Sequence, residues 1–139
     1  MQTPPAPRWF TIAAIAALLF EILGCLLFVM QARIDRSALD AADQAVLNAA
    51  PSWMILAYGV AVASGVIGAI LLLLRRRMAV PLLAVSLVAV VIQDSAYLLV
   101  PELRNLTSSD DLFLPFVILV ICYAIWHFAR RARVSGWLR

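Results

Sequence analysis

The sequence contains no lysine and has few acidic residues, cysteines or histidines. All eleven basic residues among the 139 are arginines, and only 14% of the residues are charged, whereas a soluble domain carries about a quarter. The two cysteines, Cys25 and Cys122, lie in apolar segments without the CxxC spacing of metal or redox sites. We therefore interpret both as small hydrophobic residues. A single histidine, His127, cannot supply a pair of haem ligands.

Catalytic and nucleotide-binding motifs are also missing. The sequence has no Gly-rich phosphate loop, nucleophile elbow or HExxH pair. We therefore expect no enzyme activity, no cofactor and no metal site. The formal net charge is +3, but the arginines cluster beside apolar segments, where basic residues determine membrane orientation. Nucleic acid is therefore not an expected partner.

Long apolar segments make up most of the chain. Hydrophobic residues account for 65% of it, and the mean hydropathy is +0.98. A helix crosses the hydrocarbon core of a bilayer with roughly 20 apolar residues. Four segments are long enough, at about 9–31, 53–74, 78–100 and 112–129. The first is too long for a signal peptide, so we interpret it as a retained helix. Three prolines predict a non-helical tail over residues 1–8.

These segments predict an all-α protein, with residues 1–139 forming a single membrane domain. We expect a four-helix transmembrane bundle with up-down-up-down topology. Arginine-rich short loops remain in the cytoplasm, and the arginines divide unequally between the two sides. The pattern therefore predicts a protein of the bacterial inner membrane with both termini cytoplasmic. The expected cytoplasmic arginines are Arg8, Arg75, Arg76, Arg77, Arg130, Arg131, Arg133 and Arg139, and the others are Arg33, Arg36 and Arg104.

The first outer loop is the longest segment between the spans. Ser37 is placed to cap a helix, with Asp40 as its partner three residues on. Apolar residues then recur at helical spacing from Leu39 to Ala49, and Pro51 closes the segment. We expect a short helix of about three turns that lies on the outer membrane surface or covers the bundle. It would serve as a connector packed on the helix ends, with a gate as the alternative. The third loop, residues 101–111, is polar and is predicted to consist of turns.

Two acidic residues fall inside the apolar segments, Glu21 in the first and Asp94 in the third. A carboxyl group in hydrocarbon is costly, so it faces the bundle interior and marks a functional site by default. At about 1.5 Å of rise per residue, the two differ in depth by about one helical turn and would face one polar spot. Gln93, Tyr97 and Ser64 are the candidate site residues beside them, and the other polar residues nearby are Ser95, Tyr58 and Tyr123. The site would bind a proton or a small solute; alternatively, the carboxyl groups join helices by hydrogen bonds.

Small residues recur at four-residue spacing in the second apolar segment. Ala61 pairs with Gly65, and Ser64 pairs with Gly68. This pattern allows helices to approach closely. We expect these residues to pack within the bundle, with a dimer interface as the alternative.

Several motifs resemble a family of small bacterial four-helix membrane proteins that are often labelled sugar transporters. They are PRWF at 7–10, LLFEILGC at 18–25, PSW at 51–53, the long stretch over 65–93, and GWL at 136–138. The resemblance covers nearly the whole chain and implies a four-helix fold in the inner membrane. In that family Trp-Asn is common where Phe20 and Glu21 stand here. The resemblance thus implies a polar group at that depth, but not an acid.

A second resemblance is to the small multidrug resistance exporters, which also have four spans and an acid in the first helix that binds cations. The first outer loop here, at about 20 residues between the predicted spans, departs from their tight loop. Two functional hypotheses follow: a small-solute transporter, with a sugar as one candidate solute, or a non-catalytic accessory subunit of a larger membrane complex. The expected partners are the lipid bilayer and either further copies of the chain or that complex.

Overall fold

The computed structural model describes residues 5–139, and every regular element in that range is a helix. The four long helices are α1 (Arg8–Arg33), α3 (Ser52–Leu73), α4 (Ala79–Leu99) and α6 (Phe113–Val134). Three short ones connect them: the 3-10 helix η1 (Arg36–Ala38), α2 (Ala41–Ala49) and α5 (Pro101–Leu106). Each long helix has the length and apolar composition to cross a membrane. The predicted all-α class and four long apolar helices are thus confirmed.

The bounds of the long helices differ little from those predicted, except at the end of α6. We expected this helix to end near Ala129, but it continues to Val134. Arginine is a good helix former, so Arg130, Arg131 and Arg133 prolong the helix instead of stopping it. Residues 5–7 precede α1 without helical structure, as predicted for the proline-rich tail, while the first four residues of that tail lie outside the described range.

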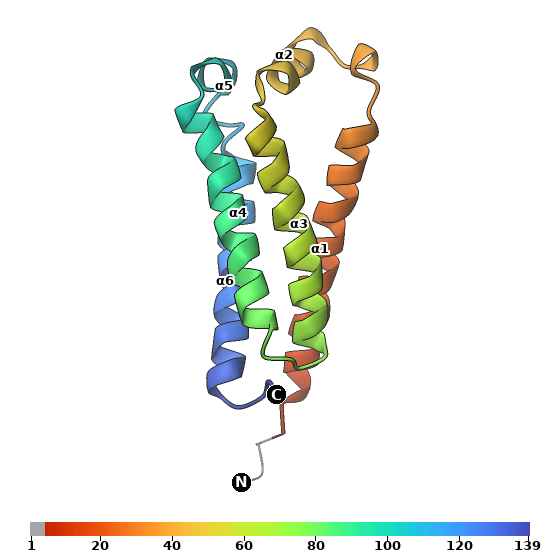
Figure 1. Ribbon diagram of the computed structural model, residues 1–139, viewed down its shortest axis with the longest axis vertical. Coiled ribbons are helices and arrows are strands. Elements are labelled where there is room, and N and C mark those ends of the chain that lie inside the picture. Colours follow the sequence, from red (N-terminus) through yellow and green to blue (C-terminus); the bar gives the residue numbers. More distant parts are fainter. Residues whose placement is uncertain (1–4) are drawn as a thin grey trace.

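The long helices lie side by side along the longest dimension of the molecule (Figure 1). The α3–α4 turn, the C-terminus and the start of α1 lie at one end, which we call the terminal end. Helices α2 and α5 lie at the other, which we call the α2/α5 end. Helix α3 packs on both α1 and α4, and α4 also packs on α6. Helices α1 and α6 are therefore the outer members of the arrangement.

Aromatic side chains join α1 to α6 at the terminal end. Phe10 is fully buried, and its ring centroid lies 5.4 Å from that of Phe128 and 5.9 Å from that of Trp137. Trp9 lies 5.5 Å from Trp137 in an edge-to-face arrangement. The guanidinium of Arg75 lies over the Phe10 ring at 5.8 Å, a distance at which a cation is attracted to the ring face. This cluster closes the bundle between α1 and α6.

The last residues of the chain fold back over the α3–α4 turn. Gly136, with φ of 75°, ends α6 in the left-handed conformation that glycine adopts without strain. The chain then reverses, and Leu138 becomes buried. The backbone N–H of Arg139 donates to the carbonyl of Arg75 at 2.6 Å, and the N–H of Arg77 donates to the carbonyl of Arg139 at 2.9 Å. These bonds attach the C-terminus to the turn that joins α3 and α4.

Helices α3 and α4 approach closely where α3 carries small residues. A Cβ atom on Gly68 would lie 2.9 Å from Cγ of Leu83 and 3.2 Å from its backbone nitrogen. Ala61, Ser64 and Gly65 are also buried. The predicted packing of these small residues within the bundle is confirmed.

The α2/α5 end differs from the sequence prediction in two details. The short helix exists, but Asp40 caps it by accepting a hydrogen bond from the Asp43 N–H at 2.8 Å. The predicted cap, Ser37, instead donates its hydroxyl and backbone N–H to Asp35. The predicted third loop also contains a helix, α5. Its signal in the sequence was Pro101 at the first helical position. Leu103 of this helix is buried.

Candidate functional site

A pocket of about 1040 Å³ lies between α1, α3, α4 and α6. It extends from Glu21, near the middle of α1, to residues of α2 such as Val46. Most of its lining is apolar, with a few polar side chains directed into it. A pocket of this size with few convergent polar groups is the usual form of a small-molecule binding site. It stops short of the aromatic cluster, so the terminal end forms its floor.

The carboxyl group of Glu21 lies at the deep end of the pocket, and its side chain is 6% exposed. It occupies the space that Gly65 leaves on α3. A Cβ atom on Gly65 would overlap this carboxyl group and would come within 3.0 Å of Oγ of Ser86. In residues 5–139 no donor is hydrogen-bonded to the Glu21 carboxyl group. Glycine at position 65 is therefore what allows an acid of α1 to reach the α3–α4 contact.

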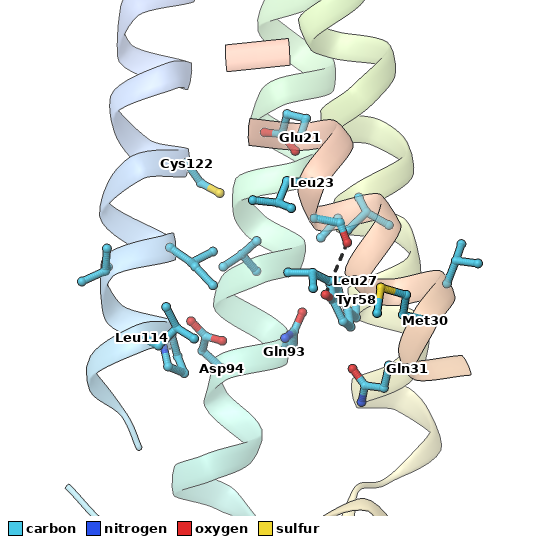
Figure 2. Close-up of a pocket in the computed structure, with 18 of the residues that line it drawn as sticks. Glu21, Leu23, Leu27, Met30, Gln31, Tyr58, Gln93, Asp94, Leu114 and Cys122 are labelled. Atoms are coloured by element: carbon cyan, nitrogen blue, oxygen red, sulfur yellow. Dashed lines mark hydrogen bonds between the residues drawn. The ribbon is translucent and has the colours of Figure 1, made fainter. Parts of the chain in front are cut away.

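Three of the predicted site residues line the pocket from α4, namely Gln93, Asp94 and Tyr97. All are half-buried. Figure 2 shows Gln93 and Asp94 on the α4 side of the space between α6 and α1, well separated from Glu21. The sequence thus correctly suggested that both acids face the bundle interior.

The predicted depth of the two acids needs correction. Glu21 lies level with Ser86, and Asp94 is eight residues further along α4, about 12 Å at 1.5 Å per residue. The separation is thus about two helical turns, where one was predicted. The predicted depths were counted from the ends of each helix, and such a count does not include the position at which two helices cross. The two acids therefore form two separate polar positions in one pocket.

The fifth predicted residue, Ser64, does not line the pocket. Its hydroxyl donates to the carbonyl of Val60, one turn earlier in its own helix, at 2.6 Å. A serine in an apolar helix commonly satisfies its hydroxyl in this way. The serine that does line the pocket is Ser86 of α4, whose hydroxyl donates to the Ala61 carbonyl of α3 at 2.8 Å. Sequence reasoning missed it because a lone serine in an apolar run carries no distinguishing signal.

Two further residues line the pocket: Cys122, which was not predicted as a site residue, and Tyr58, which was predicted only as a polar residue in the neighbourhood of the acids. Cys122 of α6 is buried and lines the deep part of the pocket on the side facing Glu21. Tyr58 of α3 lines the wall near α1, and its hydroxyl lies 3.4 Å from the Gly24 carbonyl, to which it donates. Its ring stacks edge-to-face with that of Phe28, with centroids 5.0 Å apart. The tyrosine therefore presents an aromatic face held in place by two contacts with α1.

The charges of the lining are unevenly distributed. Glu21 and Asp94 lie in the deep and middle parts, while the only basic lining residue, Arg33, lies at the α2/α5 end together with Asp43. The interior of the pocket thus has acidic groups without a basic partner nearby. Within the described range, no three His, Cys, Asp or Glu side chains are grouped as metal ligands.

Comparisons with known proteins give no match: no family model, curated protein or solved structure is similar to this chain.

Proposed function

We propose that this protein is a transporter of small solutes in the bacterial inner membrane. The observation that carries the proposal is the pocket: polar groups converge in an apolar lining between helices long enough to span a bilayer, and one end is closed. Transport requires a site that opens to one side of the membrane while the other side is sealed. The resemblance noted in the sequence makes a sugar one candidate solute.

The proposed membrane arrangement is an up-down-up-down bundle with both termini in the cytoplasm. It is supported by the distribution of arginines, because eight of the eleven fall at the terminal end and basic loops stay cytoplasmic. Helix α2 would then lie on the outer surface, at the outer end of the pocket, which its residue Val46 lines.

Labelling with an impermeant maleimide tests this orientation. Cys25 and Cys122 are first replaced by alanine, and a single cysteine is then introduced by Arg76→Cys or by Asp110→Cys. In intact spheroplasts we expect labelling of the Asp110→Cys variant only, and in inverted vesicles labelling of the Arg76→Cys variant only. Labelling of the Arg76→Cys variant from outside would refute the arrangement.

Uptake into proteoliposomes tests transport. Radiolabelled hexoses, disaccharides and organic cations are offered to vesicles that contain the wild-type protein or the Asp94→Asn variant. We expect uptake of at least one probe above that of empty vesicles and a loss of about tenfold or more with Asp94→Asn, because the pocket then loses a charge that is only partly solvated. The matched control is Asp110→Asn, which removes an exposed carboxylate outside the pocket. Uptake that Asp94→Asn leaves unchanged removes this acid from the mechanism.

An accessory role in a larger membrane complex is the alternative outcome. Mild detergent extraction followed by native mass spectrometry distinguishes the two. A stable complex with a different protein, together with no uptake by the isolated chain, would replace the transporter proposal.

A further inference from the structure

The outer face of α6 carries an exposed stripe that takes no part in the pocket. Phe116, Val120 and Tyr123 are 63%, 49% and 52% exposed, and His127 and Arg130 are also exposed. Successive members are three or four residues apart, so they lie on one side of the helix. None of the five lines the pocket between α1, α3, α4 and α6. These residues, which we call the α6 stripe, therefore face the surroundings of the bundle, which in a membrane are the lipids.

The α6 stripe changes in polarity along its length. Helix α6 runs toward the terminal end (Figure 1), and the stripe begins with the apolar Phe116 and Val120. Tyr123 and His127 follow, with their rings stacked at a centroid distance of 6.0 Å, and Arg130 comes last. Tyrosine gathers at the level of the lipid head groups. The stripe thus has the order of a phospholipid, from hydrocarbon chains through the polar interface to the phosphate.

Arg130 is positioned by an aromatic ring. Its guanidinium lies over the Trp126 ring at 5.6 Å from the centroid, a distance at which the cation is attracted to the ring face. Trp126 in turn packs against the buried core that includes Phe10 and Ala129, so the ring is a fixed support. Within residues 5–139, no acceptor is hydrogen-bonded to the side chain of Arg130. Because a guanidinium can bind a phosphate through two parallel hydrogen bonds, Arg130 presents a positioned and free set of donors.

The indole nitrogen of Trp126 is a second donor at the same place. Nε1 is buried, and among the described residues it has no hydrogen-bond acceptor. Buried donors are nearly always paired, and an unpaired one costs free energy. A phosphate oxygen that Arg130 holds beside this ring supplies an acceptor. The unpaired N–H therefore favours a ligand with oxygen acceptors over a purely apolar one.

The charge around Arg130 is positive and uncompensated. Eight of the eleven arginines lie at the terminal end, and no acidic residue lies there in the described part of the chain. The exposed Arg131 and Arg133 follow Arg130 directly. Basic clusters at the ends of transmembrane helices attract anionic head groups. Charge complementarity therefore selects a lipid with a net negative head.

We propose that the α6 stripe binds an anionic phospholipid of the leaflet at the terminal end. Its phosphate lies at Arg130 and Trp126, its polar interface lies beside Tyr123, and its chains lie along Phe116 and Val120. This inference goes beyond the proposed transport function and does not depend on it, since the stripe is separate from the pocket.

Native mass spectrometry of the full chain in mild detergent tests the proposal. The protein is titrated with palmitoyl-oleoyl phosphatidylglycerol or with phosphatidylcholine, which has the same chains and a zwitterionic head. We expect the first phosphatidylglycerol to bind at concentrations about fivefold lower or less, and we expect free glycerol 3-phosphate not to displace it. Equal binding of phosphatidylcholine would overturn the charge selection, and displacement by glycerol 3-phosphate would overturn the lipid as the source of the phosphate.

Matched variants test the site itself. Arg130→Gln should weaken phosphatidylglycerol binding by about fivefold, while Arg76→Gln, which removes an exposed arginine of the same end outside the stripe, should weaken it by less than about twofold. Equal weakening by both would show that net charge alone attracts the lipid, and would refute the site. Trp126→Phe keeps a ring under Arg130 but removes the N–H, and should weaken binding by about threefold. Binding that Trp126→Phe leaves unchanged would remove the indole N–H from the site. Circular dichroism and gel filtration verify that each variant is folded.

Discussion

The two ends of the bundle are held together by different means. At the terminal end, α1 and α6 meet through buried rings, and the C-terminal residues are hydrogen-bonded to the α3–α4 turn. Toward the α2/α5 end the same two helices lie on opposite walls of the pocket. With the terminal end in the cytoplasm, as proposed, this conformation is closed on the inside, and residues of α2 such as Val46 line the pocket at the outer end. Transport would therefore require the contacts of the terminal end to open, and the strength of these contacts can be measured.

The largest expected effect is that of removing the ring of Phe10. Phe10→Ala should lower the free energy of unfolding in detergent micelles by about 3–5 kcal/mol, as for other buried aromatic residues, because Phe10 is fully buried in the aromatic cluster. The matched variant is Phe28→Ala, near the α2/α5 end, where the ring is only partly buried. Phe28→Ala should lower the free energy of unfolding by less than half as much as Phe10→Ala. Equal losses in a denaturant titration followed by circular dichroism would contradict the difference between the ends.

The next effect concerns the C-terminal segment. Leu138→Ala should cost about 2–4 kcal/mol of unfolding free energy, since Leu138 is 1% exposed against the terminal-end core. Leu114→Ala makes the same change in α6 at a side chain that is 64% exposed and should stay within about 0.5 kcal/mol of wild type. The same titration measures both variants. A negligible loss with Leu138→Ala would mean that the C-terminal residues do not secure the terminal end.

Most of the fold could be predicted from the sequence because the long helices are defined by apolar length alone. Four segments exceed the span of a bilayer core, and no other pattern competes with them. The fold-back of residues 136–139 could not be predicted. It depends on Gly136 reversing the chain and on hydrogen bonds with a distant turn, in which the Arg75 carbonyl accepts and the Arg77 N–H donates. Neither feature produces a periodic pattern.

The candidate site was predictable only in part. Glu21 and Asp94 stood out because a carboxyl group in an apolar segment is costly, and both line the pocket. Their separation and the role of Ser86 depend on where α1, α3 and α4 cross. Gly65 showed in the sequence that some group approaches α3 closely, but not that this group is the carboxyl of Glu21. Residue type therefore indicated which side chains line the pocket, while the places where the helices cross determine how far apart these side chains lie.

A smaller effect distinguishes the helix contacts of the two halves. Gly68→Ala places a Cβ atom against the backbone of Leu83 in the terminal half, and overpacking of this kind costs about 1–3 kcal/mol. The gain in helix propensity of about 1 kcal/mol offsets part of it, so the expected net loss is about 1 kcal/mol. In Gly24→Ala the new atom would lie at an ordinary 3.7 Å from Val62, so this variant should be as stable as wild type or more so. Equal thermal stability of the two variants would contradict the tighter packing of the terminal half.

The smallest expected effect is a response to acid confined to the α2/α5 end. The Ser108 hydroxyl donates to Asp111 at 2.7 Å, and the Ser108 backbone N–H donates at 2.9 Å. These bonds hold the pKa of Asp111 below its ordinary value of 3.8. A carboxyl group whose folded-state pKa is lowered stabilises the fold above its unfolded-state pKa, and this contribution is lost as the pH falls through the folded-state value. The turn before α6 should therefore loosen only below about pH 4.

Titration by NMR of Asp111 in wild type and in Ser108→Ala measures this effect. Removing the hydroxyl should raise the pKa of Asp111 toward 3.8, while the pKa of Asp35, which Ser37 lowers in the same way, should not change. An unchanged pKa of Asp111 in the Ser108→Ala variant would show that the Ser108 hydroxyl does not lower this pKa. The described part of the terminal end contains no acidic residue, so its rings and backbone bonds have no comparable response. Acid should therefore loosen the end that bears the pocket before the end that closes it.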